Sequence, residues 1–488
     1  MKKQALTFLL IAALLSVSCG SETVKPDDGT TGGTTPEVTT VPEGDGLPEM
    51  KMDGWEMRVL NYTEDSLSWV NTRIIVEEQS GDVLDDAIYE RNTSLEERFD
   101  FRIVTDEVGQ FDVSDAVAKN VLAGDDSYDI YVMSEGMSAS YLPYTLDWHN
   151  IPYLSLDKAW WNPAATSVYE FGGKQTALAG NMTLAAASRA VCTVFNKRIW
   201  NELGDSSVDL YQLVRDGKWT LDRFIEYSKT VNKDMNGDTV WDEKDVYGMF
   251  MGRGFKGYIA SFLCASGMNF TEKNADGLDE FTLYKNEKAL DLMKKLVDAW
   301  SEGDGYTYYE GGVHGPSISM FFENGHALFS QRVPHDIYKL RTMDDDIGIL
   351  PMPKYDEEQE SYCSAAWGGA VWTLSKTFDM TYADNLGIVL EAMSYYGYKD
   401  VIPVYKEVAL KTKTARDNES ADMLDIVFNT IYFDFGTNIM YDAVFAQTFL
   451  TDIFNSKSSE SIVSSIESAR PTIDKYISDI FEISAEMK

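Results

Sequence analysis

Oxygen-bearing side chains recur at set positions along the twelve residues from Asp234 to Asp245. Positions 1, 3, 5, 9 and 12 are Asp234, Asn236, Asp238, Asp242 and Asp245, and the Val240 carbonyl stands at position 7. This is the spacing of the EF-hand loop, in which a hard cation such as calcium is held in an oxygen cage. Thr239 replaces the usual glycine, and Asp245 replaces the usual glutamate. The spacing predicts a structural calcium site, with an acidic surface turn as the alternative.

Other reactive side chains are few, and they are scattered. The cysteines, Cys19, Cys192, Cys264 and Cys363, form no CxxC pair, and the histidines form no HExxH motif. We therefore expect the cysteines beyond Cys19 to be small buried hydrophobes. The formal charge of −37 argues against nucleic acid as a partner, because phosphates would be repelled.

The amino terminus is typical of an exported protein. Residues 1–18 combine two lysines with an apolar run too short to span a bilayer, which predicts a signal peptide. The stretch Leu15-Ser16-Val17-Ser18-Cys19 resembles a bacterial lipobox, so we expect Cys19 to carry a lipid; a soluble secreted protein is the alternative. Residues 19–50 are rich in Gly, Thr, Pro and acids, which predicts a flexible linker.

Strands and helices alternate after the linker, and they predict a sheet that would place functional loops. Residues 57–62, 101–106 and 128–133 are expected to be strands, and 84–99 and 113–124 are expected to be helices. This βαβαβ order favours a parallel sheet covered by helices. Ligands of such sheets bind beyond the carboxyl ends of the strands, so the loops at 62–66 and 134–137 become candidates for lining a site.

The same alternation recurs later in the chain. A strand that runs into a helix is predicted over 190–204, helices over 219–232 and 283–303, and strands over 347–355 and 368–376. The chain is mostly helical from 382 onward. A length of 488 residues favours two lobes, because one core rarely exceeds roughly 250–300 residues.

Several short motifs in order resemble the extracellular solute-binding proteins of ABC importers, in particular the sugar-binding family 1 type. They are Val194-Phe195-Asn196-Lys197 with Trp200 and Gly204, Gly217-Lys218-Trp219-Thr220-Leu221, Phe322-Glu323-Asn324-Gly325-His326-Ala327, Ile347-Gly348 with Leu350-Pro351-Met352-Pro353, and Gly368-Gly369 with Leu374-Ser375-Lys376. Phe195 stands where the family usually has Tyr.

The resemblance implies an α/β, two-lobe periplasmic-binding-protein-like fold, with a mostly parallel sheet in each lobe and a ligand cleft between the lobes. The first lobe would comprise 51–185, the second 186–366, and residues 367–440 would return to the first; 441–488 would add helices to either lobe. Crossings between the lobes are expected near 181–191 and 367–372. The implied partners are a small solute, expected to be a mono- or oligosaccharide, and a membrane permease. The protein would work as a monomer, outside the membrane, with hinge closure trapping the solute.

Aromatic and polar residues around this expected cleft are the candidate ligand contacts, because sugars need flat apolar faces and hydrogen-bonding side chains. Trp367 precedes a crossing strand beside two glycines and is the leading stacking candidate. Trp160 and Trp161 are adjacent, so one of them is expected to face the cleft. Glu135 follows the third strand, and Arg253 and Phe255 lie in a glycine-rich loop. Core packing is the alternative for each tryptophan.

Two other functions remain open at this point. A surface glycoside hydrolase would need two cleft carboxylates, and a chain with 79 acidic residues always offers some pair, although no hydrolase motif is present. A glycan-binding surface lipoprotein without an importer would show the same motifs. We expect a binding protein rather than an enzyme.

Overall fold

The structure is a computed structural model that describes residues 44–66, 70–242, 244–249, 251–252, 256–275, 277–301, 308–309, 318–337, 340, 342–411, 418–440, 450, 453 and 458–487. All of these belong to the compact unit Pro42–Lys488. The predicted signal peptide, Cys19, most of the predicted linker, Arg253 and Phe255 lie outside the described residues. Every helix within the described ranges is too short or too polar to cross a bilayer.

The first sheet is built by the amino-terminal part of the chain and one late strand. Its order is β2 (Phe101–Val108), β1 (Trp55–Tyr62), β3 (Ile130–Ser134), β16 (Ala370–Ser375) and β4 (Thr145–Leu146). β1 pairs in parallel with both β2 and β3, while β16 is antiparallel to β3 and β4. The helices α1 (Val83–Phe99) and α2 (Gln110–Ala123) join the first three strands, so the predicted βαβαβ unit is confirmed.

Local sequence explains where these helices begin and end. The Asp82 carboxylate accepts hydrogen bonds from the backbone N–H groups of Leu84 and Asp85, which satisfies donors at the start of α1. Gly124 ends α2 at φ 68°, the left-handed conformation that glycine adopts without strain. The predicted stop at Gly124 is therefore confirmed.

The second sheet is built by the middle of the chain. Its order is β14 (Ile347–Pro351), β7 (Cys192–Asn196), β13 (Ala327–Arg332) and β8 (Tyr247–Met249). β7 is antiparallel to both β13 and β14, and β13 is parallel to β8. A buried apolar cluster includes Val132 of the first sheet and Phe329 of the second, so the core continues from one sheet to the other.

The sheets are less parallel in their pairing than the sequence predicted. Within the described residues, one strand of each sheet runs against all the others, namely β16 in the first and β7 in the second. Each of these strands lies between two neighbours and therefore makes two antiparallel pairings. The reason is topological, because both strands enter their sheets from the segments that link the two sheets.

Four of the five motifs that suggested the family lie in or beside the second sheet, and the fifth, from Gly368 to Lys376, belongs to β16 of the first sheet. A Cβ atom on Gly348 would lie 2.2 Å from the Phe195 ring, so the glycine leaves room for that ring across the β7–β14 pair. The Trp219 indole donates to the Pro351 carbonyl at 2.9 Å. Asn196 caps α5 (Lys197–Leu203) by accepting the N–H of Ile199 at 3.0 Å. These residues of the motifs are thus contacts and caps of a single packing unit.

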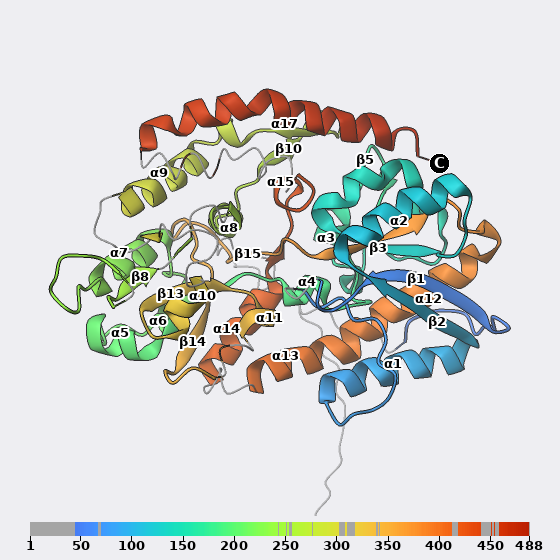
Figure 1. The fold of residues 1–488 in the computed structure, drawn as a ribbon, viewed down its shortest axis with the longest axis horizontal. Helices are drawn as coiled ribbons and strands as arrows, with labels where there is room; N and C mark the ends of the chain where they lie inside the picture. Colours follow the sequence, from blue (N-terminus) through green and yellow to red (C-terminus); the bar gives the residue numbers. More distant parts are fainter. Residues whose placement is uncertain are drawn as a thin grey trace, which may run out of the picture. The chain divides into compact units, whose positions relative to one another are not determined.

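Helices surround both sheets and fill the carboxyl-terminal part of the described chain (Figure 1). They include α6 (Leu210–Arg215), α7 (Leu221–Val231), α8 (Lys256–Ala265), α9 (Glu287–Ser301), α12 (Ala383–Tyr396), α13 (Ile402–Lys411), α14 (Asn418–Asn429), α15 (Phe435–Asn438) and α17 (Ile462–Ser484). The helix predicted over 283–303 begins later than expected. Residues Leu283–Lys285 form a 3₁₀ turn, and Asn286 then accepts the N–H of Ala289, which starts α9 anew.

α17 packs against elements that accompany both sheets. It contacts α9 and the β10–β11 hairpin (Thr271–Lys273 and Asp279–Phe281) on one side, and β5 (Glu170–Phe171) and the 3₁₀ segment η1 (Glu135–Tyr144) on the other. Figure 1 shows this helix running along one edge of the molecule's ribbon. The last helix therefore links the two halves of the fold, namely the first half, built on the sheet β2-β1-β3-β16-β4, and the second half, built on the sheet β14-β7-β13-β8.

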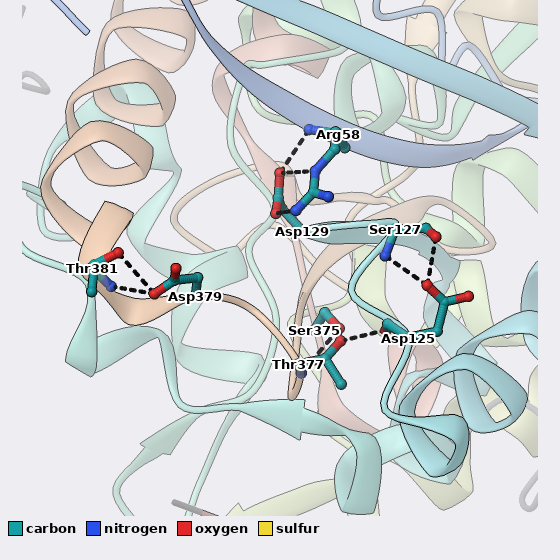
Figure 2. A network of polar contacts seen from close by, with 8 residues as sticks. All are labelled: Arg58, Asp125, Ser127, Asp129, Ser375, Thr377, Asp379 and Thr381. Carbon is teal, nitrogen blue, oxygen red and sulfur yellow. Dashed lines mark hydrogen bonds and ion pairs between the residues drawn. The ribbon is translucent and has the colours of Figure 1, made fainter. Parts of the chain in front are cut away.

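A polar network closes the first sheet at the edge where β3 begins and β16 ends (Figure 2). The Arg58 guanidinium pairs with Asp129, with the Nη2 to Oδ1 distance at 2.6 Å. The Thr377 hydroxyl donates to the Asp125 carbonyl at 2.9 Å. These bonds hold the turns at the amino ends of the parallel strands, on the edge of the sheet opposite to their carboxyl ends.

Candidate functional site

The two sheets direct the carboxyl ends of their strands toward the segments that link them. In the first sheet, Ser134 at the end of β3 pairs with Ala370 at the start of β16. In the second sheet, Cys192 at the start of β7 pairs with Arg332 and Pro351, which end β13 and β14. Because ligands of open α/β sheets bind beyond the carboxyl ends of strands, both sheets offer their binding edge to the same region.

Three linking segments lie side by side in this region. Ala190 forms an antiparallel bridge with Ala366, and the Val191 N–H donates to the Ala365 carbonyl at 2.7 Å. The short strand β15 (Ser364–Ala365) also pairs in parallel with β17 (Ile431–Tyr432). The first two segments fall in or beside the stretches where the sequence placed crossings. The third, around 431–438, has no counterpart in the sequence analysis.

Trp367 lies at the centre of these crossings. Its side chain is only 7% exposed, and its indole N–H donates to the Ser261 hydroxyl of α8 at 2.9 Å. The Arg189 guanidinium lies over the ring at 5.1 Å from its centroid, and Arg189 Nε donates to the Trp367 carbonyl at 3.0 Å. In this arrangement the indole is held between α8 and Arg189, which follows α4 (Ala185–Ser188). Its role as a platform for a sugar stays a prediction.

Glu135 directly follows the carboxyl end of β3, opposite the start of β16. Its carboxylate is 3% exposed and accepts a hydrogen bond from Asn438 Nδ2 at 3.0 Å. A Cβ atom on Gly369 would lie 2.7 Å from Glu135 Oε1, so glycine is needed for the close approach. Burial raises the pKa of Glu135. Hydrogen bonds from the Gly369 backbone and from Asn438 lower this pKa, but by less than burial raises it. Asn438 Nδ2 also donates to the Ala366 carbonyl, next to Trp367, so Glu135 and Trp367 lie near the same crossing. Their contact with a solute stays a prediction.

Trp160 and Trp161 lie elsewhere, inside the first half of the fold. They are 7% and 0% exposed, so the expectation that one of them faces the cleft is not met. Their indole N–H groups donate to the two oxygens of Glu391 on α12, at 3.0 and 2.6 Å. The sequence argument held that two adjacent tryptophans cannot share a core, and it failed because a buried carboxylate accepts from both.

The predicted calcium loop follows α7, and its oxygens accept hydrogen bonds from the loop's own backbone. The two Asp234 oxygens accept the N–H groups of Gly237 and Thr239, at 2.6 and 2.8 Å. The two Asp245 oxygens accept those of Met235 and Asp242, at 3.0 and 2.9 Å.

Thr239 adopts φ 64°, the conformation that favours glycine at the sixth position. Across the described residues, no three His, Cys, Asp or Glu side chains lie close enough to hold a metal ion. Calcium therefore stays a prediction, in which Asp234, Asn236, Asp238, Asp242, Asp245 and the Val240 carbonyl would be the ligands.

Sequence reasoning missed the residues of the third crossing, above all Asp434 and Asn438. Asp434 caps α15 by accepting the N–H of Thr437, and it also accepts the N–H of Phe270 at 3.2 Å. Burial raises the pKa of Asp434 to about 7, although the backbone hydrogen bonds from Thr437 and Phe270 act to lower it. The only sequence signal was an aspartate ahead of a small polar turn, which is common in any chain.

The fold is similar to those of solved extracellular binding proteins. A cyclic α-maltosyl-1,6-maltose binding protein from Arthrobacter globiformis has a TM-score of 0.58 and 15% identity, over 88% of this chain and 100% of that one. A family 1 extracellular solute-binding protein from Bifidobacterium longum subsp. infantis has 0.55 and 14%, over 86% and 99%.

An ABC substrate-binding protein from Listeria monocytogenes in complex with cycloalternan gives a TM-score of 0.54 at 13% identity, over 87% of this chain and 100% of that one. No protein-family model and no curated protein matches the sequence. The chain is therefore a mixed α/β protein with the periplasmic-binding-protein-like fold of solute-binding proteins, in which two sheets face a common region across three crossings. At these identities the likeness establishes the fold, and the solute is a separate question.

Proposed function

We propose that this protein captures an extracellular carbohydrate and delivers it to an ABC permease in the membrane. The observation that carries the proposal is the convergence of both sheets, by their carboxyl edges, on the crossings that hold Trp367 and Glu135. A solute bound there would contact both halves of the fold. Closure around the solute would then change the surface that a permease meets.

Carbohydrate is the solute class that the observations favour. The similar solved structures include proteins bound to cycloalternan and to maltotetraose, which are glucose oligomers. A large indole beside a buried carboxylate supplies the apolar face and the hydrogen-bond acceptor that a sugar ring needs. Trp367 and Glu135 are accordingly the residues we assign to solute contact, and Arg253 and Phe255 remain candidates from the sequence.

The amino terminus supports a place outside the membrane. Lipid on Cys19 would anchor the chain, and residues 20–50 would let the folded part range near the bilayer surface. The calcium loop would serve stability rather than binding, because it follows α7 and lies apart from the crossing segments in the sequence and the sheet order.

Calorimetric titration of the purified protein with a panel of oligosaccharides tests the proposal. The panel would hold linear and cyclic α-glucans, with cellotetraose and a tripeptide for comparison. We expect saturable heat and a raised melting midpoint with at least one carbohydrate, because a ligand of the folded state stabilises it. Absence of both effects for every carbohydrate would refute the sugar assignment.

Uptake and turnover separate this function from its rivals. Deleting the gene should abolish uptake of the carbohydrate that the pure protein binds. Retained uptake would leave a surface glycan-binding protein, and products appearing in the titration cell would identify a glycoside hydrolase instead.

A further inference from the structure

The four-residue helix α15 (Phe435–Asn438) is labelled in Figure 1. Buried polar groups at its two ends tie it to both halves of the fold. At its start, Asp434 Oδ2 accepts the N–H of Phe270, which lies between α8 and β10 in the chain segment that carries the second sheet. At its end, Asn438 Nδ2 donates to Glu135, which directly follows β3 of the first sheet. These two contacts bridge the halves through a single turn of helix.

Asn438 has every hydrogen-bonding position of its amide in use. Its Oδ1 accepts from the Asp434 N–H at 3.0 Å and from the Thr437 hydroxyl at 3.1 Å. Its Nδ2 donates to Glu135 Oε2 at 3.0 Å and to the Ala366 carbonyl at 2.7 Å. An amide has two donors and two lone pairs, so this one is satisfied in a single orientation. Because the side chain is 1% exposed, water cannot replace a lost partner without opening the site.

Apolar packing also holds the first two residues of α15, Phe435 and Gly436, against both halves of the fold. A Cβ atom on Gly436 would lie 2.3 Å from Phe270 Cβ, so the helix backbone rests directly on that residue. The Phe435 ring meets Phe171 of β5 edge to face, with the centroids 5.5 Å apart. Both rings are buried. One polar contact and one apolar contact thus hold α15 to each half of the fold.

We propose that α15 sets the relative placement of the two halves, with Asn438 as the positioning residue that couples it to Glu135. A rotation of the first half about the crossings moves Glu135 against a helix whose other end is bound to Phe270. The Asn438–Glu135 bond therefore favours the arrangement seen here over any other. Asn438 touches no solute in this account and acts through Glu135, so the inference rests on the proposed function for its consequence in binding.

The expected consequence for binding is a change in affinity without a change in contacts. The apparent dissociation constant equals the intrinsic constant divided by the fraction of molecules in the binding-competent arrangement. Loss of the Asn438–Glu135 bond changes that fraction, and the affinity changes by the same factor.

Energy transfer between two dyes measures the arrangement directly, without any solute. The dyes would be attached to Lys119→Cys on α2 and Asn201→Cys on α5, which are both exposed. The full chain would also carry Cys19→Ser and Cys363→Ser, since Cys192 and Cys264 are buried. We expect Asn438→Ala to shift or broaden the transfer-efficiency distribution of the solute-free protein, and Glu135→Ala to do the same.

Two matched variants distinguish positioning from simple loss of stability. Thr437 is as buried as Asn438, but its hydroxyl bonds stay within α15, apart from a 4.0 Å contact to Cys264. Thr437→Ala should lower the melting midpoint and leave the distribution unchanged. Glu135→Gln keeps an acceptor for the Asn438 amide, so it should restore the wild-type distribution.

The proposal is overturned if Asn438→Ala leaves the distribution as in the wild type, or if Thr437→Ala shifts it equally. This outcome is independent of whether any carbohydrate binds. The proposed function is tested separately, by titration of the wild-type protein.

Discussion

Trp367→Ala is the substitution that most directly tests the assignment of the solute site. The side chain is 7% exposed and packs with Arg189 and Ser261, so its truncation should destabilise the fold. Truncation of a buried tryptophan to alanine costs about 3–5 kcal/mol of unfolding free energy. Loss of the indole hydrogen bond to Ser261 adds about 1 kcal/mol. A stacking platform would lose in addition about 1–3 kcal/mol of binding free energy, which is roughly 5- to 150-fold in the dissociation constant.

Milder and matched variants keep this test readable if the alanine variant unfolds. Trp367→Phe retains one ring face but removes the N–H bond to Ser261 and part of the indole's area, so it should weaken binding and stability less than the alanine variant does. Trp372→Phe alters an indole that is 2% exposed within β16 and should lower stability with no change in affinity.

Urea denaturation would give the stability of each variant, and calorimetric titration with the carbohydrate identified by the panel would give its affinity. If the folded fraction of Trp367→Ala binds as tightly as the wild type, Trp367 is a core residue and the assignment is refuted.

Further expectations concern the anchor, the loop and the buried carboxylates. Cys19→Ala should release the protein from membranes; membrane fractionation that finds it still bound would contradict the lipid. A chelator should lower the melting midpoint, and Asp234→Ala with Asp238→Ala should remove that sensitivity; an identical midpoint with and without chelator argues for an acidic turn. Glu391→Ala removes the acceptor of the indole N–H groups of Trp160 and Trp161, and each lost hydrogen bond should cost about 1–3 kcal/mol. Urea denaturation should therefore show that the free energy of unfolding falls by at least about 2 kcal/mol. Asp434 has a folded-state pKa of about 7, above the unfolded value of about 3.9. Its contribution to stability is therefore complete below about pH 4 and is lost as the pH rises through about 7. The unfolding free energy should fall between about pH 4 and about pH 8 by an amount on the order of 4 kcal/mol that Asp434→Asn lacks; equal slopes in both proteins would contradict this.

The sequence predicted what depends on local pattern. Apolar pattern and helical spacing located β1, α1, β2, α2 and β3 closely, because each element buries apolar residues and the helices end at residues suited to a helix end, such as Gly124. The cap Asn196 also acts beside its own helix, α5. Such features are visible in a short window of residues.

The sequence failed where a contact joins distant parts of the chain. Trp160 and Trp161 were expected to include a cleft residue because nothing in the nearby sequence indicates that Glu391 of α12 accepts hydrogen bonds from both indoles. α15 was missed because a four-residue helix has no periodicity, and its importance lies in Asn438 and Glu135. Trp367 and Glu135 were predicted at the crossings because both residues flank strands whose ends the topology brings together, and their role in binding stays a prediction.

The place of β16 within the first sheet has a consequence for how the protein is made. β16 lies between β3 and β4, so the sheet cannot be completed until residues up to Ser375 are available, long after Leu146 has been synthesised. Pairing across such a sequence separation is intrinsically slow, because loop closure must precede any gain from the contact. In the export that we propose, this order would leave the first sheet incomplete until residues up to Ser375 have passed the membrane, and the two halves of the fold would then form together.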